Sequence, residues 1–198
     1  MLLGVMLLYV GAVLLVNGIW LIGQARAAAL APAGDTSPAE SAHPTLLENR
    51  EVTVLNLFTG FVGIVCAGTL LIQGNQDGDL ASIRGGGFIL LFAFTYLWVA
   101  LNTFLGVDGR AFGWYCLFVA ITAVAACIYT FKDAAGDDAN IWLGIDWALW
   151  SVLWFMFFLL LALQRPIARV TGIVAIVEGI GTAWIFGFLL LQGSIAFG

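Results

Sequence analysis

Two carboxylate side chains, those of Glu178 and Asp146, lie within apolar blocks long enough to cross a membrane. Eight residues of the block Val170–Gln192 precede Glu178, and five residues of the block Ile141–Leu163 precede Asp146. An ionisable side chain is costly inside a membrane span, so it usually faces a polar pathway or a partner. We therefore expect Glu178 to line a polar path, with a structural carboxyl bonded to a neighbouring helix as the alternative. For Asp146, a place at a pore mouth and a simple place at a helix end fit equally well.

The block Ile141–Leu163 also holds four of the 8 tryptophans of the chain. Trp147, Trp150 and Trp154 are three and four residues apart, so they share one face of a helix. Tryptophan normally gathers at the two membrane interfaces, whereas this row runs from the outer end of the block toward its middle. The row is either an aromatic packing seam or a narrow slot in which a small, flat, polar solute stacks on indole rings.

Neighbouring residues would shape such a slot. Leu153 lies beside Trp150 and Trp154 and would narrow it. In the third apolar block, Phe94 and Trp98 are four residues apart and would supply the facing aromatic rings. These residues and the two carboxylates are the candidates for contact with a solute.

The remaining inventory of reactive side chains excludes most enzyme classes. The only histidine is His43, which leaves the apolar blocks without a histidine ligand for haem and without a base for a Ser-His hydrolase. There is no HExxH motif, and a paired-aspartate membrane protease would need a second aspartate in the spans. The three cysteines, Cys66, Cys116 and Cys127, lie within apolar blocks and lack metal-ligand spacing. We therefore expect no catalytic residue, no metal site and no cofactor.

The bulk composition indicates an integral membrane protein made of helices. Of the 198 residues, 62% are hydrophobic and only 10% are charged, and the mean hydropathy is +1.04. A helix needs about 20 apolar residues to cross the hydrocarbon layer, and backbone groups in lipid must be satisfied within the protein. Six blocks have this length, namely residues 2–23, 52–73, 86–105, 111–131, 141–163 and 170–192. We predict one all-α integral membrane domain, residues 1–198, that forms a bundle of six transmembrane helices.

The connections predict how these helices are arranged. Residues 24–50, rich in Ala, Pro and Ser, form the only long connection, which we expect to be flexible. The other connections are short, so successive helices should pack as three antiparallel hairpins, formed by helices 1–2, 3–4 and 5–6. Gly4, Gly11 and Gly18 are seven residues apart and share one helical face, which favours close packing against another helix.

The distribution of basic residues predicts the orientation in the membrane. The second and fourth connections carry only Arg84 and Lys132, whereas the first, third and fifth carry Arg26, Arg50, Arg110, Arg165 and Arg169. By the positive-inside rule, the odd-numbered connections are cytoplasmic and both termini lie outside the cytoplasm. The net charge of −5 and the absence of a basic stripe argue against a nucleic-acid partner.

Short polar and aromatic motifs in five of the blocks resemble the AmiS/UreI family, in order along nearly the whole chain and failing mainly in the loops. They are Leu7-Leu8-Tyr9-Val10-Gly11 with Asn17-Gly18, Phe94-Thr95-Tyr96-Leu97 with Ala100-Leu101-Asn102, Trp114-Tyr115 with Leu117-Phe118-Val119-Ala120-Ile121, Val152-Leu153-Trp154, and Glu178-Gly179 with Thr182-Ala183-Trp184-Ile185. Generic lipid-facing helices do not need these residues, so the resemblance is specific.

The resemblance implies a multi-pass protein of the bacterial inner membrane that passes urea or short-chain amides. It also implies a homo-hexamer in which each protomer has its own pore, surrounded by its three hairpins. Carried over onto matching positions, the pore-lining residues would be Leu7, Val10, Leu14, Asn17, Phe94, Trp98, Trp147, Trp150, Leu153, Trp154 and Glu178. Trp98 departs from an acid-gated member of the family, which has tyrosine there, so the pore would be tighter or would lack that hydroxyl.

The acid-gated member carries several titratable histidines in its outer loops and C-terminus, whereas His43 lies in a connection that we place in the cytoplasm. We therefore expect a passive channel for urea or short aliphatic amides without histidine-based acid gating, and no enzyme. Two alternatives stay open. One is a proton-coupled amide transporter with Glu178 or Asp146 as proton carrier. The other is a membrane scaffold that recruits a cytosolic amidase or urease through residues 24–50.

Overall fold

The computed structural model describes residues 1–30 and 46–197, and six of its helices have the length and apolarity to cross a membrane. The prediction of six membrane-spanning helices is confirmed, and the described residues contain no strand. The first four helices are α1 (Leu2–Leu30), α2 (Asn49–Asp77), α3 (Leu80–Leu105) and α4 (Arg110–Asp133). The fifth span joins α5 (Asp138–Phe157) to the π-helical turn η1 (Phe158–Ala162), and the sixth joins α6 (Ala168–Glu178), the π-helical turn η2 (Gly179–Ile185) and α7 (Phe186–Leu191). His43 and most of the connection predicted to be flexible lie outside the described residues.

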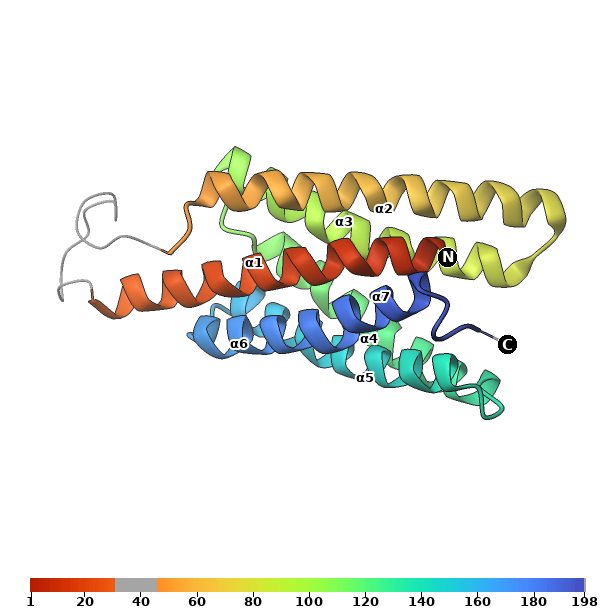
Figure 1. The fold of residues 1–198 in the computed structure, drawn as a ribbon. Helices are drawn as coiled ribbons and strands as arrows, with labels where there is room; N and C mark the ends of the chain where they lie inside the picture. Colours follow the sequence, from red (N-terminus) through yellow and green to blue (C-terminus); the bar gives the residue numbers. More distant parts are fainter. Residues whose placement is uncertain (31–45, 198) are drawn as a thin grey trace.

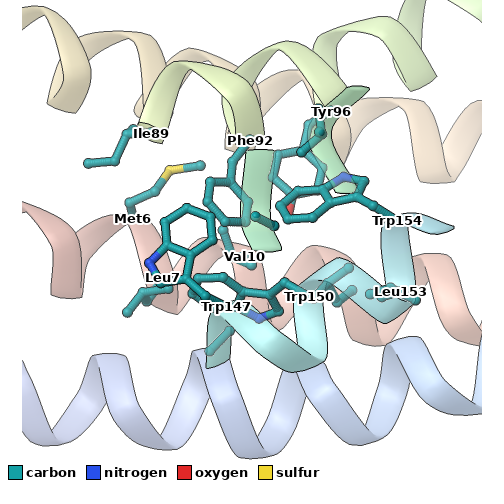
Figure 2. Packing of buried hydrophobic residues seen from close by; sticks show 14 of the residues in the cluster. Met6, Leu7, Val10, Ile89, Phe92, Tyr96, Trp147, Trp150, Leu153 and Trp154 are labelled. Carbon is teal, nitrogen blue, oxygen red and sulfur yellow. The ribbon is translucent and has the colours of Figure 1, made fainter. Parts of the chain in front are cut away.

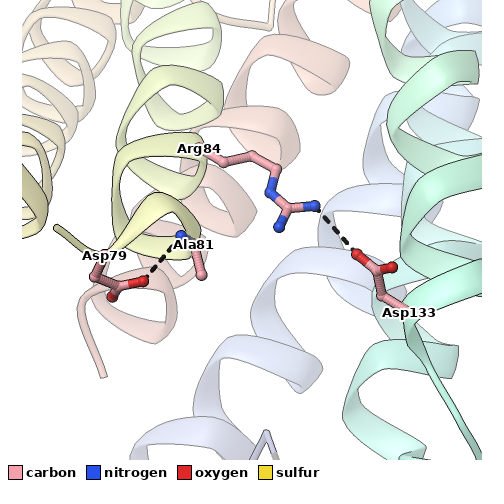
Figure 3. Close-up of polar contacts among 4 residues, drawn as sticks. All are labelled: Asp79, Ala81, Arg84 and Asp133. Atoms are coloured by element: carbon pink, nitrogen blue, oxygen red, sulfur yellow. Dashed lines mark hydrogen bonds and ion pairs between the residues drawn. The ribbon is translucent and has the colours of Figure 1, made fainter.

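Caps define the tight turn between α2 and α3. The Asp79 carboxylate accepts hydrogen bonds from the Ser82 hydroxyl (2.6 Å) and from the backbone N–H of Ala81 (2.9 Å), so it satisfies donors at the start of α3. Figure 3 shows the second of these contacts. The hydrogen bonds from Ser82 and Ala81 lower the pKa of Asp79 below its usual value. Gly78, with a φ of 68°, ends α2 in the left-handed conformation that glycine adopts without strain.

One ion pair joins the α2–α3 turn region to the end of α4. Arg84 Nη1 lies 3.1 Å from Asp133 Oδ2 (Figure 3). The two side chains are 50% and 58% exposed, so this pair contributes at most about 1 kcal/mol.

The closest helix pairs are α2 with α3, α4 with α5, and α1 with the last span (α6, η2 and α7). In Figure 1, α1 runs beside α6 and α7 while α2 and α3 lie together on the other side of it. The predicted pairing of helices 1–2, 3–4 and 5–6 is therefore wrong, because α3 makes few contacts with α4 and α5 makes few with α6. Short connections join helices that are neighbours in sequence, but they do not decide which helices pack most closely.

Glycines explain why α1 packs against the last span. Each of three α1 glycines faces one glycine there at backbone contact: Gly4 faces Gly187, Gly11 faces Gly179, and Gly18 faces Gly172. A Cβ added to the α1 glycines would lie only 2.5 to 3.1 Å from the facing carbonyl oxygens. The predicted use of the α1 glycine face for close packing is thus confirmed, and we refer to these six residues as the glycine seam.

The turn η2 keeps the glycine seam in register. The α1 glycines are seven residues apart, as are Gly172 and Gly179, but Gly187 follows Gly179 by eight residues. A π-helical turn accommodates one additional residue in a helix. Because η2 begins at Gly179, it absorbs the extra residue and returns Gly187 to the face that meets α1.

The helix pairs meet in an aromatic core. The Phe92 ring of α3 lies 5.0 Å from the Trp150 ring and 4.7 Å from the Trp154 ring, measured between centroids. Met6, Leu7 and Val10 of α1 belong to the same buried cluster and are drawn with these rings in Figure 2. The core therefore draws on α1, α3 and α5, which do not pair closely with one another.

Candidate functional site

A cavity of about 400 Å³ lies between the aromatic core and one end of the bundle. Its walls come mainly from α1, α3 and α5, and its mouth includes the α3–α4 turn at Gly106–Gly109 and Asn49 at the start of α2. Most of the lining is apolar, and the polar side chains within the spans are few: Asn17, Thr95, Tyr96, Asn102 and Thr103. Sites for small molecules have this character, with a hydrophobic wall and a small number of polar groups that orient the solute.

The inner end of the cavity is closed by large side chains. Leu14, Phe92 and Trp150 line this end. Beyond it, Leu7, Val10 and Trp147 are almost completely buried, at 2%, 1% and 4% exposure, and belong to the aromatic core shown in Figure 2. A solute that entered the cavity would therefore meet an apolar, largely aromatic constriction near the middle of the bundle.

A hydrogen-bonded chain holds one wall of this constriction. The Trp150 Nε1–H donates to the Thr182 hydroxyl at 2.8 Å, and that hydroxyl donates to the Glu178 carbonyl oxygen at 2.6 Å. All three residues are buried. The indole of Trp150 is thus oriented by η2, because Glu178 ends α6 and Thr182 lies one turn later within η2.

A second polar contact lies at the cavity wall between α1 and α2. The side-chain amides of Asn17 and Asn56 exchange two hydrogen bonds, of 3.1 Å and 2.7 Å, and Asn56 also donates to the Val52 carbonyl at 2.9 Å. Asn17 lines the cavity, whereas Asn56 is completely buried behind it. Asn56 was not among the predicted site residues. The signal that could have identified it is its polar side chain within an otherwise apolar block of the sequence.

The two carboxylates lie deep in the bundle. Asp146 is 1% exposed and Glu178 is 5% exposed, and they are near enough to interact electrostatically. Both oxygens of Asp146 and the Oε2 atom of Glu178 have no hydrogen-bond partner among the described groups. Of the two places expected for Asp146, a pore mouth or a helix end, the structure supports neither, because α5 begins at Asp138 and carries Asp146 two turns inward.

Five of the predicted pore residues line the cavity, namely Leu14, Asn17, Trp150, Leu153 and Trp154. Leu7, Val10 and Trp147 lie in the core beyond its inner end, and Glu178 is buried beside Thr182. The structure thus brings the three predicted tryptophans of α5 together around Phe92.

Phe94 and Trp98 do not lie on the cavity. Phe94 is 45% exposed, and the Trp98 ring packs against α4, with its centroid 5.3 Å from that of Tyr115. The inward face of α3 instead carries Phe92, Thr95, Tyr96 and Val99. A spacing of four defines a shared face without saying which way it points, and the burial of Phe92 and Tyr96 shows that the other face of α3 points inward.

No three side chains of His, Cys, Asp or Glu come together as a metal site within residues 1–30 and 46–197. The arrangement instead suits a small neutral solute, since its walls are aromatic and its polar groups are uncharged except for Asp108 at the mouth.

The chain is similar to transport proteins along most of its length. The family model described as AmiS/UreI family transporter matches residues 45–194. A protein of Mycolicibacterium smegmatis described as a transporter of amidate substrates is 38% identical over 96% of this chain and 77% of its own. The acid-activated urea channel of Helicobacter pylori is 34% identical over 95% of this chain and 96% of its own. The crystal structure of the urea channel from the same pathogen superposes with a TM-score of 0.78 at 34% identity, over 98% of this chain and 99% of that one. The chain is therefore a multi-pass membrane protein that belongs to the AmiS/UreI family of transporters.

Proposed function

We propose that this protein is a passive pathway through the membrane for urea or short aliphatic amides. The observation that carries the proposal is the cavity that ends at the Trp150–Phe92 constriction, with aromatic walls and few polar groups. A planar amide fits between ring faces and exchanges hydrogen bonds with Asn17 or Thr95, whereas the apolar constriction gives an ion nothing to replace its hydration. The similarity to a urea channel and to an amidate transporter supports the same class of solute.

The proposal includes the assembly and the orientation expected from the sequence. In a homo-hexamer of the bacterial inner membrane, each protomer would carry its own pathway, with both termini outside. The cavity would then face the cytoplasm, because its mouth includes the α3–α4 turn, the third connection of the chain. Native mass spectrometry would test the number of copies, and cysteine labelling at the two chain ends in intact cells would test the orientation.

Stopped-flow light scattering on proteoliposomes tests the transport itself. We expect fast urea and acetamide entry, exclusion of glycerol, and similar rates at about pH 7.5 and about pH 5, because the described residues include no histidine to titrate between these values. A steep rise in flux at the lower pH would contradict the absence of acid gating. Protein-free liposomes supply the baseline.

The Glu178→Leu variant tests the place of Glu178 in the pathway. We expect amide permeability to fall about tenfold, since the solute loses a hydrogen-bond acceptor along the pathway, while the oligomer stays intact. The amide permeability of Glu178→Gln, which keeps one carbonyl acceptor, should lie between those of the wild type and Glu178→Leu. Unchanged permeability in Glu178→Leu would remove this residue from the pathway.

A second candidate is proton-coupled amide transport, favoured by two buried carboxyl groups, three of whose oxygens have no hydrogen-bond partner among the described groups. Accumulation of acetamide against its gradient, driven by an imposed pH gradient, would select it over the passive pathway.

The third possibility, a scaffold for a cytosolic amidase or urease, rests on residues 24–50, of which residues 31–45 lie outside the described part of the chain.

A further inference from the structure

The least explained atoms in the bundle are the carboxyl oxygens of Asp146. Both are buried, and neither has a hydrogen-bond partner among the described groups, while Glu178 Oε2 nearby is in the same state. Buried polar atoms are almost always hydrogen-bonded in folded proteins, so an exception calls for a ligand or a functional cause. Three such atoms on two neighbouring residues point to one common cause.

The hydrogen bonds that several described side chains make in this part of the bundle go to other acceptors. The Trp150 Nε1–H goes to Thr182, and the Thr182 hydroxyl proton goes to the Glu178 backbone carbonyl. The amide groups of Asn17 and Asn56 are held by each other.

Cations are also far from these carboxyl groups along the chain. The stretches 141–163 and 170–192 contain no Lys, Arg or His. At the end of the bundle where α5 begins, Arg84 pairs with Asp133, and Lys132 lies over the Tyr129 ring. Since no described protein group donates to these oxygens, a solute that reaches them can supply the missing hydrogen bonds.

We propose that Asp146 and Glu178 form a recognition site for the two amino groups of urea, one carboxyl group for each nitrogen. This inference rests on the proposed function and names the solute within it. Urea carries N–H donors on two nitrogens, whereas acetamide carries them on one. A carboxyl group keeps acceptor capacity in either protonation state, so the site accepts N–H groups whether or not it holds a proton. The pair therefore favours urea over amides with a single nitrogen.

The site also lies at a suitable level of the bundle. Asp146 precedes Trp150 by four residues on α5, so it sits one helical turn beyond the residue that closes the cavity. Glu178 is joined to the same tryptophan through Thr182. A urea molecule that passes the constriction would exchange hydration for these carboxyl oxygens.

A carboxyl group kept for recognition differs measurably from one kept for stability. Leucine at position 146 would remove two unpartnered buried oxygens and fill similar space, which is neutral or stabilising for the fold. If Asp146 instead held the fold together, the same change would lower the melting temperature.

The experiment compares urea and acetamide permeabilities of the full-length protein in proteoliposomes, together with its melting temperature in detergent. For Asp146→Leu we expect urea permeability to fall about tenfold and acetamide permeability by less than about twofold. The melting temperature should stay the same or rise. Asp146→Asn, which keeps the size of the side chain, should also lower the ratio of urea permeability to acetamide permeability. It replaces the leucine variant as the test if that variant does not fold. Asp138→Asn, the same change at an exposed position on the same helix, should leave the ratio unchanged.

Three outcomes would overturn the assignment. An unchanged ratio in both Asp146 variants would show that the residue does not distinguish the solutes. A fall in melting temperature with a parallel loss of both permeabilities would make it a structural carboxyl. Solute accumulation that a pH gradient drives in the wild type but not in Asp146→Asn would make the pair a proton carrier. If the wild type conducts neither solute, the proposed function itself fails and this assignment fails with it.

Discussion

The last span meets its two neighbours through opposite kinds of residue. On one side is the glycine seam with α1, where backbones touch and no polar side chain takes part. On the other side, α5 presents Trp142, Asp146 and Trp150 to Glu178, Thr182 and Phe186; we refer to these six residues as the polar seam. There the Trp142 and Phe186 rings stack with centroids 5.2 Å apart, Trp150 donates to Thr182, and the two carboxylates interact.

The difference separates the part of the molecule that specifies the fold from the part that handles a solute. In the glycine seam the two backbones touch, so the packing requires only that the residue at each contact be small. The polar seam contains large aromatic rings and unpartnered oxygens, which a fold alone would not require. The turn η2 belongs to both, since Gly179 faces Gly11 while Thr182 holds Trp150. Packing on the glycine side therefore sets the position of groups on the polar side.

The largest effect should come from breaking the glycine seam at its tightest point. In Gly18→Ala, the new Cβ would lie 2.5 Å from the Gly172 carbonyl oxygen and 2.5 Å from Ile176 Cγ1. A backbone oxygen cannot turn aside, so α1 and α6 must separate. We expect the free energy of unfolding to fall by about 3 kcal/mol or more, read from thermal or denaturant unfolding in detergent.

Gly68→Ala is the matched control for that substitution. No atom lies within 4 Å of a Cβ built at Gly68 on α2, so the methyl group meets open space. Alanine also favours the helix over glycine by up to about 1 kcal/mol, and stability should stay the same or rise. Equal losses in both variants would mean that glycine matters here for reasons other than close contact.

The sequence predicted the glycine seam better than the polar seam, for physical reasons. The seven-residue spacing of Gly4, Gly11 and Gly18 marks a smooth helical face, and length with apolarity marks the spans. The partner of that face was not predictable, because the glycines of the last span are out of step by one residue and only the π-helical turn η2 restores the match.

The candidate site was predicted in part. A tryptophan row at spacings of three and four shares a face in any helix, so the α5 side of the cavity followed from the sequence. The α3 side did not, since Phe92 and Phe94 are both aromatic and only the packing of the bundle places Phe92 inward. Nor could spacing show that Asp146 and Glu178 interact, because they lie on different helices and meet only after folding.

An intermediate effect is expected at the contact between α1 and α2, where polar groups are satisfied by one another. In Asn17→Leu, the Asn56 carbonyl oxygen loses its partner inside the bundle. An unsatisfied buried group costs about 2 kcal/mol, and the melting temperature should fall accordingly. The Asn17→Leu, Asn56→Leu double variant should recover part of this loss, because no orphaned amide remains. A double variant less stable than the single one would show that the amide pair does more than satisfy itself.

The smallest change in stability, with a clear change in transport, is expected within the polar seam. Thr182→Val keeps the shape of the side chain but leaves the Trp150 Nε1–H without its acceptor, which costs about 1 kcal/mol. Released from η2, the indole should no longer hold one orientation at the constriction, so the permeability ratio of acetamide to the longer butyramide should fall. Thr182→Ser restores the hydroxyl and should restore the ratio.

If Thr182 acts through Trp150, adding Thr182→Val to a Trp150→Phe variant should change the permeability ratio no further, whereas additive effects would mean that the threonine touches the solute itself. Because this substitution leaves the glycine seam intact, its effect on transport would show that the polar seam can be altered without disturbing the packing that positions it.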